Sequence, residues 1–125
     1  MKNLTLFIIL VTILIIIGGF FINEVKKEKS IDASPITTHE YFWSETCPHC
    51  AEVSKFMENW ERKDQFDLQK FEVGKSASNA KLLIARGLNC KIDQKDLGVP
   101  LLVTPQGQCV EGNEPIIQYL ESLDL

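Results

Sequence analysis

The chain has 125 residues, which is enough for one domain and an appendage. Residues 31–125 hold 9 basic and 15 acidic side chains, a formal charge of −6. This acidic balance argues against nucleic acid as a partner, because phosphates attract a basic surface. Four cysteines are too few for a disulfide-rich scaffold, but they are enough for two pairs.

The first segment is a run of 19 uncharged residues, from Leu4 to Ile22 (LTLFIILVTILIIIGGFFI). As a helix it would cover about 28 Å, close to the roughly 30 Å hydrocarbon core of a bilayer. We therefore predict a single-pass membrane anchor over 1–22 and a polar linker over 23–36. A cleaved signal peptide is the alternative, but its apolar core is usually about 7–15 residues long and precedes small residues.

Residues 37–125 alternate between short apolar runs and helical patterns. Gly87 is predicted to end the second helix of this region, and Asn113 to cap the third. The order β-α-β-α-β-β-α predicts an α/β domain whose first two strands are parallel and joined by a right-handed crossover. The predicted strands cover 38–44, 66–73, 99–104 and 108–111, and the predicted helices cover 48–63, 76–86 and 114–123.

The motif Cys47-Pro48-His49-Cys50 follows a strand and a short loop, and it opens a predicted helix. The first N–H groups of a helix have no intrahelical partner and its dipole is positive there, so a Cys47 thiolate would be stabilised and its pKa lowered. Pro48 suits the first helical position because it has no N–H. Cys50 lies one turn on, so a disulfide can close without unwinding the helix. His49 can direct a hydrogen bond or a positive charge at the Cys47 sulfur.

We interpret Cys47 and Cys50 as a redox-active pair. A zinc or copper site is an alternative, but it would need further ligands, and Cys90 and Cys109 are isolated from one another in the sequence. A purely structural disulfide is a second alternative. Haem attachment would need a histidine after the second cysteine, where Ala51 stands. We therefore expect no metal.

An aromatic strand, a short loop, C-P-H-C and an amphipathic helix together resemble the active site of the thioredoxin-like superfamily. Gly98-Val99-Pro100 is similar to that family's cis-proline loop. The resemblance covers residues 37–123 and implies a thioredoxin-like fold, with a four-stranded mixed sheet flanked by helices.

The resemblance also implies roles for individual residues. Cys47 would form the mixed disulfide and Cys50 would resolve it. Val99 and Pro100 would position the substrate chain, and no cofactor is implied beyond the redox-active disulfide. Trp43, four residues before Cys47, is expected to border the site.

Two branches of the superfamily compete. C-P-H-C is similar to the motif of bacterial extracytoplasmic thiol:disulfide oxidases, whereas the compact size resembles glutaredoxins, which are glutathione-dependent reductases. The Gly-Gly pair usual in glutaredoxins is replaced here by the stretch EGNE, residues 111–114. The family's buried carboxylate, six residues before the first cysteine, is replaced by Tyr41. Glu40 beside it should face the other side of the strand.

Cys90 and Cys109 have two interpretations, a second disulfide or two free cysteines that behave as small hydrophobes. A disulfide would close a loop of about 20 residues and favour an oxidising compartment. The lysines that flank the apolar run lean slightly towards a cytoplasmic domain instead. His39, at the start of the first strand, is expected to be exposed.

We expect the domain to lie on the extracytoplasmic side of a membrane and to exchange disulfides with protein substrates. An oxidase would need a membrane redox partner that re-oxidises it, and a reductase would need one that supplies electrons. Both directions of electron flow remain open from the sequence.

Overall fold

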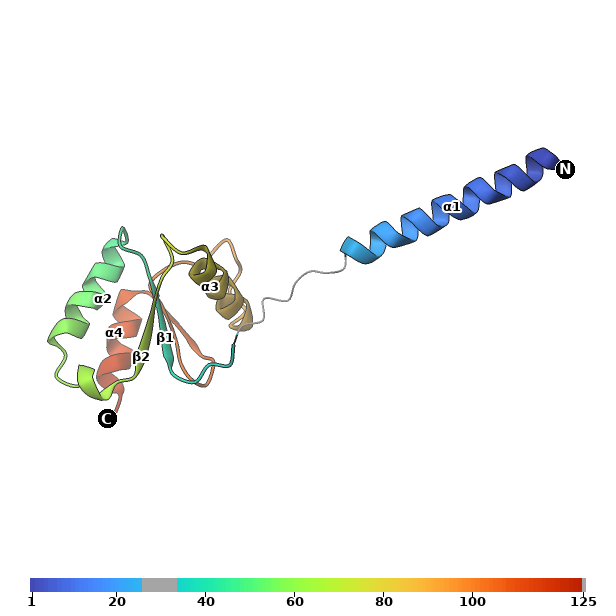
Figure 1. Cartoon of the computed structure of the whole chain (residues 1–125). Coiled ribbons are helices and arrows are strands. Elements are labelled where there is room, and N and C mark those ends of the chain that lie inside the picture. Colours follow the sequence, from blue (N-terminus) through green and yellow to red (C-terminus); the bar gives the residue numbers. More distant parts are fainter. Residues whose placement is uncertain (26–33, 125) are drawn as a thin grey trace. The chain divides into compact units, whose positions relative to one another are not determined.

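The computed structural model describes residues 1–25 and 34–124, with side chains of the first helix as far as residue 17. The chain divides into two compact units, Met1–Asp32 and Ala33–Leu125. The elements are α1 (Lys2–Val25), β1 (His39–Trp43), α2 (Pro48–Asn59), the short 3-10 helix η1 (Lys63–Gln65), β2 (Leu68–Glu72), α3 (Ala77–Asn89), β3 (Leu101–Val103), β4 (Cys109–Glu111) and α4 (Asn113–Ser122) (Figure 1). This order confirms the one predicted from the sequence.

The first unit contains α1, which runs three residues into the predicted linker 23–36. Most of its large apolar side chains between Leu4 and Ile17 are exposed. In the part of the chain that the structure describes, no helix has the length and apolar character needed to cross a membrane. The membrane anchor over 1–22 stays a prediction, and residues 26–33 of the linker lie outside the described residues.

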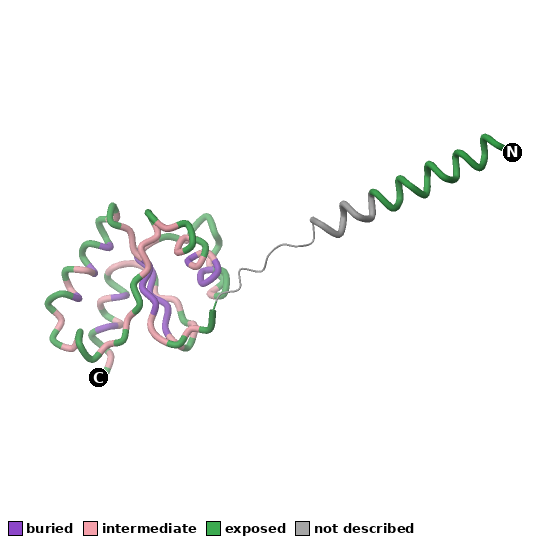
Figure 2. Tube along the Cα trace, in the orientation of Figure 1, coloured by how far each residue is buried: buried purple, intermediate pink, exposed green. Residues whose placement is uncertain are grey.

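The second unit is built on a four-stranded sheet in the order β2-β1-β3-β4. β1 and β2 are parallel, as predicted for the first βαβ unit, whereas β3 pairs antiparallel with both β1 and β4. The sheet is therefore mixed, and its central strands are buried while β2 and β4 form the edges (Figure 2).

Helices cover both faces of the sheet, with α2 and α4 on one face and α3 on the other (Figure 1). Side chains alternate along β1, so Tyr41 points to the α2/α4 face and Phe42 to the α3 face. The core on the first face consists of Tyr41, Val53, Met57, Leu102, Ile116 and Leu120. The core on the second face consists of Phe42, Leu83, Leu101 and Val103.

Three predicted helix boundaries were wrong. α3 continues through Gly87 to Asn89, and this glycine serves packing, because a Cβ there would lie 2.5 Å from a methyl group of Leu97. α4 is preceded by Gly112, whose φ of 89° favours glycine, and Asn113 is already helical. α2 ends at Asn59 because the next residue, Trp60, adopts an extended backbone and packs edge-on against Phe66.

The prediction that His39 is exposed was also wrong. The imidazole is half-buried, with its Nε2 2.9 Å from the hydroxyl of Tyr119 and its ring against Phe66. Burial lowers the pKa of His39 below its ordinary value of 6.5, and the nearby Asp67 carboxylate partly opposes this. The folded domain therefore favours the neutral imidazole.

This environment predicts an acid-sensitive contribution to stability. Below about pH 6.5 the unfolded chain binds a proton at His39 more readily than the folded chain, so the free energy of unfolding falls as the pH falls. Chemical denaturation at pH 7.5 and 5.5 should show a larger loss for the unsubstituted chain than for His39→Gln, which retains a hydrogen-bonding side chain. An identical loss in the two proteins would contradict the assignment.

Candidate redox site

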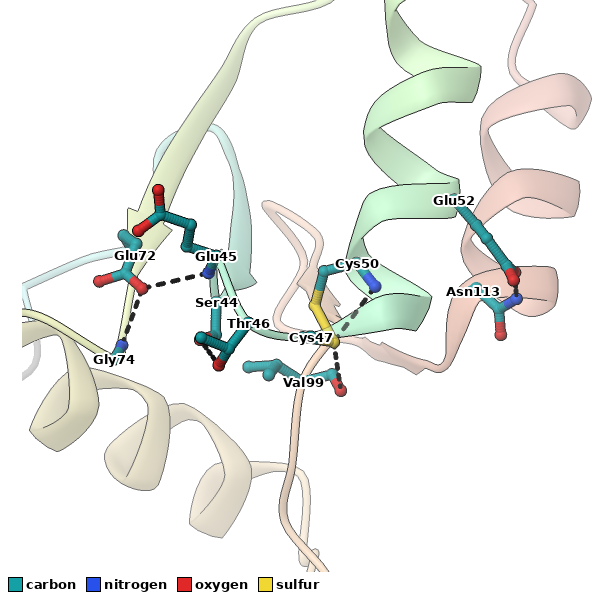
Figure 3. Close-up of a disulfide and its surroundings, with 10 residues drawn as sticks. All are labelled: Ser44, Glu45, Thr46, Cys47, Cys50, Glu52, Glu72, Gly74, Val99 and Asn113. Atoms are coloured by element: carbon teal, nitrogen blue, oxygen red, sulfur yellow. Dashed lines mark hydrogen bonds between the residues drawn. A yellow bond between two sulfur atoms is a disulfide. The ribbon is translucent and has the colours of Figure 1, made fainter.

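Cys47 and Cys50 form a disulfide at the start of α2, with 5.2 Å between their Cα atoms (Figure 3). Cys47 is the N-cap of the helix, and its sulfur accepts a hydrogen bond from the backbone N–H of Cys50 at 3.1 Å. The two cysteines differ in exposure, because Cys47 is partly accessible whereas Cys50 is only 1% exposed. Cys47 is therefore the member of the pair that offers more surface to an incoming thiol or disulfide.

The peptide bond between Val99 and Pro100 is cis and lies beside the disulfide. The carbonyl oxygen of Val99 is 3.6 Å from the Cys47 sulfur, and Pro100 is buried. The carbonyl of Pro100 accepts the N–H of Gly112 at 3.1 Å, which ties this loop to the start of α4. The structure thus brings Cys47 and Val99 together across 52 positions of sequence.

A depression of about 290 Å³ is lined in part by Cys47 and Cys50. Trp43, at the end of β1, is among the residues that line it, together with Glu45, Lys55 and Glu58. Pro48 and His49 are exposed on the first turn of α2.

The carboxylate of Glu72 is a feature that the sequence analysis missed. It accepts backbone N–H groups from two loops, those of Glu45 at 3.3 Å and Gly74 at 3.1 Å (Figure 3). It also accepts the N–H of Lys75 at 2.6 Å. Glu45 also forms an exposed ion pair with the Lys75 ammonium. No sequence motif marks this cluster, because it depends on the pairing of β1 with β2.

Glu40 and Tyr41 are neighbours in β1, and their side chains face opposite sides of the sheet, as predicted. Tyr41 is 1% exposed on the α2/α4 side, and within the described residues its hydroxyl has no hydrogen-bond partner. Burial raises the pKa of the Tyr41 phenol, so it stays protonated.

Glu40 is buried on the α3 side and forms a two-point ion pair with Arg86, at 2.7 and 2.8 Å. Arg86 also donates to the carbonyl of Ser34 at 2.7 Å. The Arg86 guanidinium therefore balances the charge of the Glu40 carboxylate. This carboxylate does not face the side of the sheet on which Cys47 and Cys50 lie. Arg86 was missed in the sequence, although it lies three residues after Leu83 and so shares the buried stripe of α3.

Cys90 and Cys109 form a second disulfide, with 6.1 Å between their Cα atoms. It joins the end of α3 to the edge strand β4, and both cysteines are partly exposed beside Gly107. Its position on an edge strand suits a structural link that holds β4 to the body of the domain.

Removing this link should destabilise the domain. The disulfide closes a loop of about 20 residues, so the double variant Cys90→Ser/Cys109→Ser is expected to lose about 3 kcal/mol of the free energy of unfolding. Urea unfolding measures the loss. Dithiothreitol should lower the stability of a Cys47→Ser/Cys50→Ser chain by a similar amount and leave a chain without Cys90 and Cys109 nearly unaffected. Equal stability with and without the second pair would contradict a structural role.

In the described residues, no group of three or more histidine, cysteine, aspartate or glutamate side chains is arranged to hold a metal ion.

No family model matches the chain, and no curated protein matches it. Solved structures do. The holo form of glutaredoxin C1 from Populus tremula x tremuloides matches with a TM-score of 0.50 and 13% identity, covering 75% of this chain and 77% of that one. A mutant of a thioredoxin-like protein matches with a TM-score of 0.47 and 24% identity, covering 68% of this chain and 96% of that one.

The second unit therefore has a thioredoxin-like α/β fold, with a four-stranded mixed sheet and helices on both faces. The Cys47–Cys50 pair lies at the start of α2 in this fold.

Proposed function

We propose that the protein is a thiol–disulfide oxidoreductase that exchanges disulfides with protein substrates through Cys47 and Cys50. The observation that carries the proposal is the asymmetry of the pair, with an accessible Cys47 sulfur at a helix N-terminus and a buried Cys50 one turn later. The N–H of Cys50 points at the Cys47 sulfur and would stabilise a thiolate there.

The exchange has two steps. In the reducing direction the Cys47 thiolate attacks a substrate disulfide, forms a mixed disulfide and releases one substrate thiolate. The Cys50 thiolate then attacks the Cys47 sulfur, which re-forms the Cys47–Cys50 disulfide and releases the second substrate thiolate. The substrate gains two electrons and the protein loses two, and an oxidase runs the same steps in reverse.

Substrate positioning in this proposal falls to Val99, Pro100 and Trp43. The carbonyl of Val99 lies beside the reacting sulfur, where it can accept an N–H from an extended substrate chain. His49 on the exposed first turn would tune the Cys47 thiolate. No cofactor beyond the redox-active disulfide is required.

The proposal includes attachment to a membrane through residues 1–22, with the domain on the extracytoplasmic side and a membrane redox partner. The uncharged run Leu4 to Ile22 supports the anchor, and two disulfides suit an oxidising compartment. Alkaline extraction of membranes tests the anchor, because a membrane-spanning chain stays in the pellet whereas a peripheral one is released.

The exchange itself is tested with the full chain and a self-quenched fluorescent disulfide peptide, with dithiothreitol as the electron source. We expect turnover well above the uncatalysed rate. A rate no higher than that of dithiothreitol alone would contradict the proposal.

The glutaredoxin-like alternative is tested with glutathione in place of dithiothreitol. It predicts a stable glutathione adduct on Cys47 in the Cys50→Ser variant.

A further inference from the structure

Two loops follow the carboxyl ends of neighbouring strands, next to Cys47. One joins β1 to α2 (44–47) and the other joins β2 to α3 (73–76), and they are neighbours because β1 and β2 are parallel. Trp43 pairs with Glu72 at the ends of these strands, and the N–H of Val73 donates to the Trp43 carbonyl at 2.9 Å. A contact that holds one of these loops in place therefore also restrains the other loop.

The Glu72 carboxylate connects the two loops. One oxygen accepts the N–H groups of Glu45 and Gly74, and the other accepts that of Lys75. Lys75, held in this way, forms its ion pair with the Glu45 side chain. Gly74 permits the close approach, because a Cβ there would lie 2.9 Å from both the Glu72 carboxylate and the Ser44 hydroxyl oxygen.

The loop of Ser44 and Glu45 determines where the Cys47 sulfur lies. The N–H of Cys47 donates to the Ser44 carbonyl at 3.1 Å, and the Cys47 sulfur in turn accepts from the N–H of Cys50. A displaced loop would therefore carry the sulfur away from the N–H that stabilises its charge.

We propose that Glu72 is a positioning residue of the redox site, which holds the 44–47 loop so that the Cys47 sulfur stays at the N-terminus of α2. This inference rests on the proposed function, because it assigns Glu72 a role in keeping Cys47 a reactive thiolate. It does not make Glu72 a catalytic residue, since its carboxylate touches the loop and not the disulfide.

The charge of Glu72 and its positioning role change the pKa of Cys47 in opposite directions. The Lys75 N–H, assisted by those of Glu45 and Gly74 and by the Lys75 charge, lowers the pKa of the Glu72 carboxyl against a smaller effect of desolvation. Glu72 is therefore negative near pH 7, and a negative charge near Cys47 raises the pKa of that thiol. Removing Glu72 lowers the Cys47 pKa if charge dominates and raises it if positioning dominates.

The pH profile of Cys47 alkylation by iodoacetamide decides between the two effects. It is measured on the reduced full chain with Cys50→Ser and Cys90→Ser/Cys109→Ser, so that only one thiol reacts. In this background, Glu72→Ala is expected to raise the Cys47 pKa and to slow alkylation at pH 6 about threefold, as expected for the partial loss of one hydrogen bond. Glu72→Gln, which keeps one acceptor oxygen, should give an intermediate rate.

Glu121→Ala is the matched control, because it removes an exposed carboxylate at the far end of α4 and should leave the profile unchanged. An unchanged or faster rate in Glu72→Ala would overturn the inference, whereas a Cys47 pKa below that of a free thiol in the chain with Glu72 intact would leave the proposed function standing. A Cys47 pKa of about 8.5 in the chain with Glu72 intact, the ordinary value for a free thiol, would overturn the proposed function and the inference together.

Discussion

Replacing Cys47 with serine is expected to abolish thiol–disulfide exchange, whereas Cys50→Ser is expected to stop the reaction halfway. The reason is the unequal exposure of the two sulfurs. Cys47 is partly exposed and receives the N–H of Cys50, so we expect it to be the nucleophile, whereas Cys50 is 1% exposed and is expected to attack only the neighbouring sulfur. Turnover should fall to the uncatalysed rate in both variants.

The two variants differ in what accumulates. Cys50→Ser should retain a covalently bound substrate that is released by dithiothreitol and visible on a non-reducing gel, and Cys47→Ser should retain none. Cys90→Ser/Cys109→Ser serves as the control, because it removes two cysteines without touching the site. If both single variants trapped substrate equally, the order of attack derived from the exposure of Cys47 and Cys50 would be wrong.

Arg86→Met is expected to lower the free energy of unfolding by about 3–5 kcal/mol, because it leaves the Glu40 carboxylate buried without its partner. Both side chains are almost fully enclosed, with 3% and 6% of the arginine and glutamate side chains exposed. The same change also leaves the Ser34 carbonyl without its donor. For a domain of this size the melting temperature should fall by more than about 10 °C.

The double variant Glu40→Leu/Arg86→Met should recover much of this loss, since an apolar pair of similar volume removes the uncompensated charge. Lys81→Met is the matched control on the same helix, because Lys81 is exposed and its replacement should change stability by about 0.5 kcal/mol or less. Thermal unfolding followed by circular dichroism measures all three. An Arg86→Met chain as stable as Lys81→Met would contradict the importance of the buried ion pair.

The sequence predicted the order of the elements because each carries a clear local signal. The alternation along β1 and the Pro48 at the start of α2 are patterns within a few residues of one another. The ends of the helices were harder to predict, because they depend on distant contacts. Gly87 lies inside α3, where its missing side chain leaves room for Leu97, and Trp60 lies outside α2 and packs against Phe66.

The same distinction applies to the site. Cys47 and Cys50 are three residues apart, and this spacing by itself indicates a redox pair. The loop of Val99 could be placed beside them only through the resemblance to the thioredoxin-like superfamily. Glu72 and Arg86 were missed because single charged residues carry no signal of their own. Each acquires its role from strand pairing or helix packing that brings it to partners 27 or 46 residues away.

The measurement that tests the central claim most directly is the redox equilibrium of the Cys47–Cys50 pair. The full chain is equilibrated with glutathione buffers, its free thiols are alkylated, and each cysteine is quantified by mass spectrometry of its peptide. A redox-active pair should be half-reduced at a potential between about −270 and −120 mV, while Cys90 and Cys109 stay oxidised. If Cys47 and Cys50 also stayed oxidised below about −300 mV, the disulfide would be structural, and the proposed exchange function would be wrong.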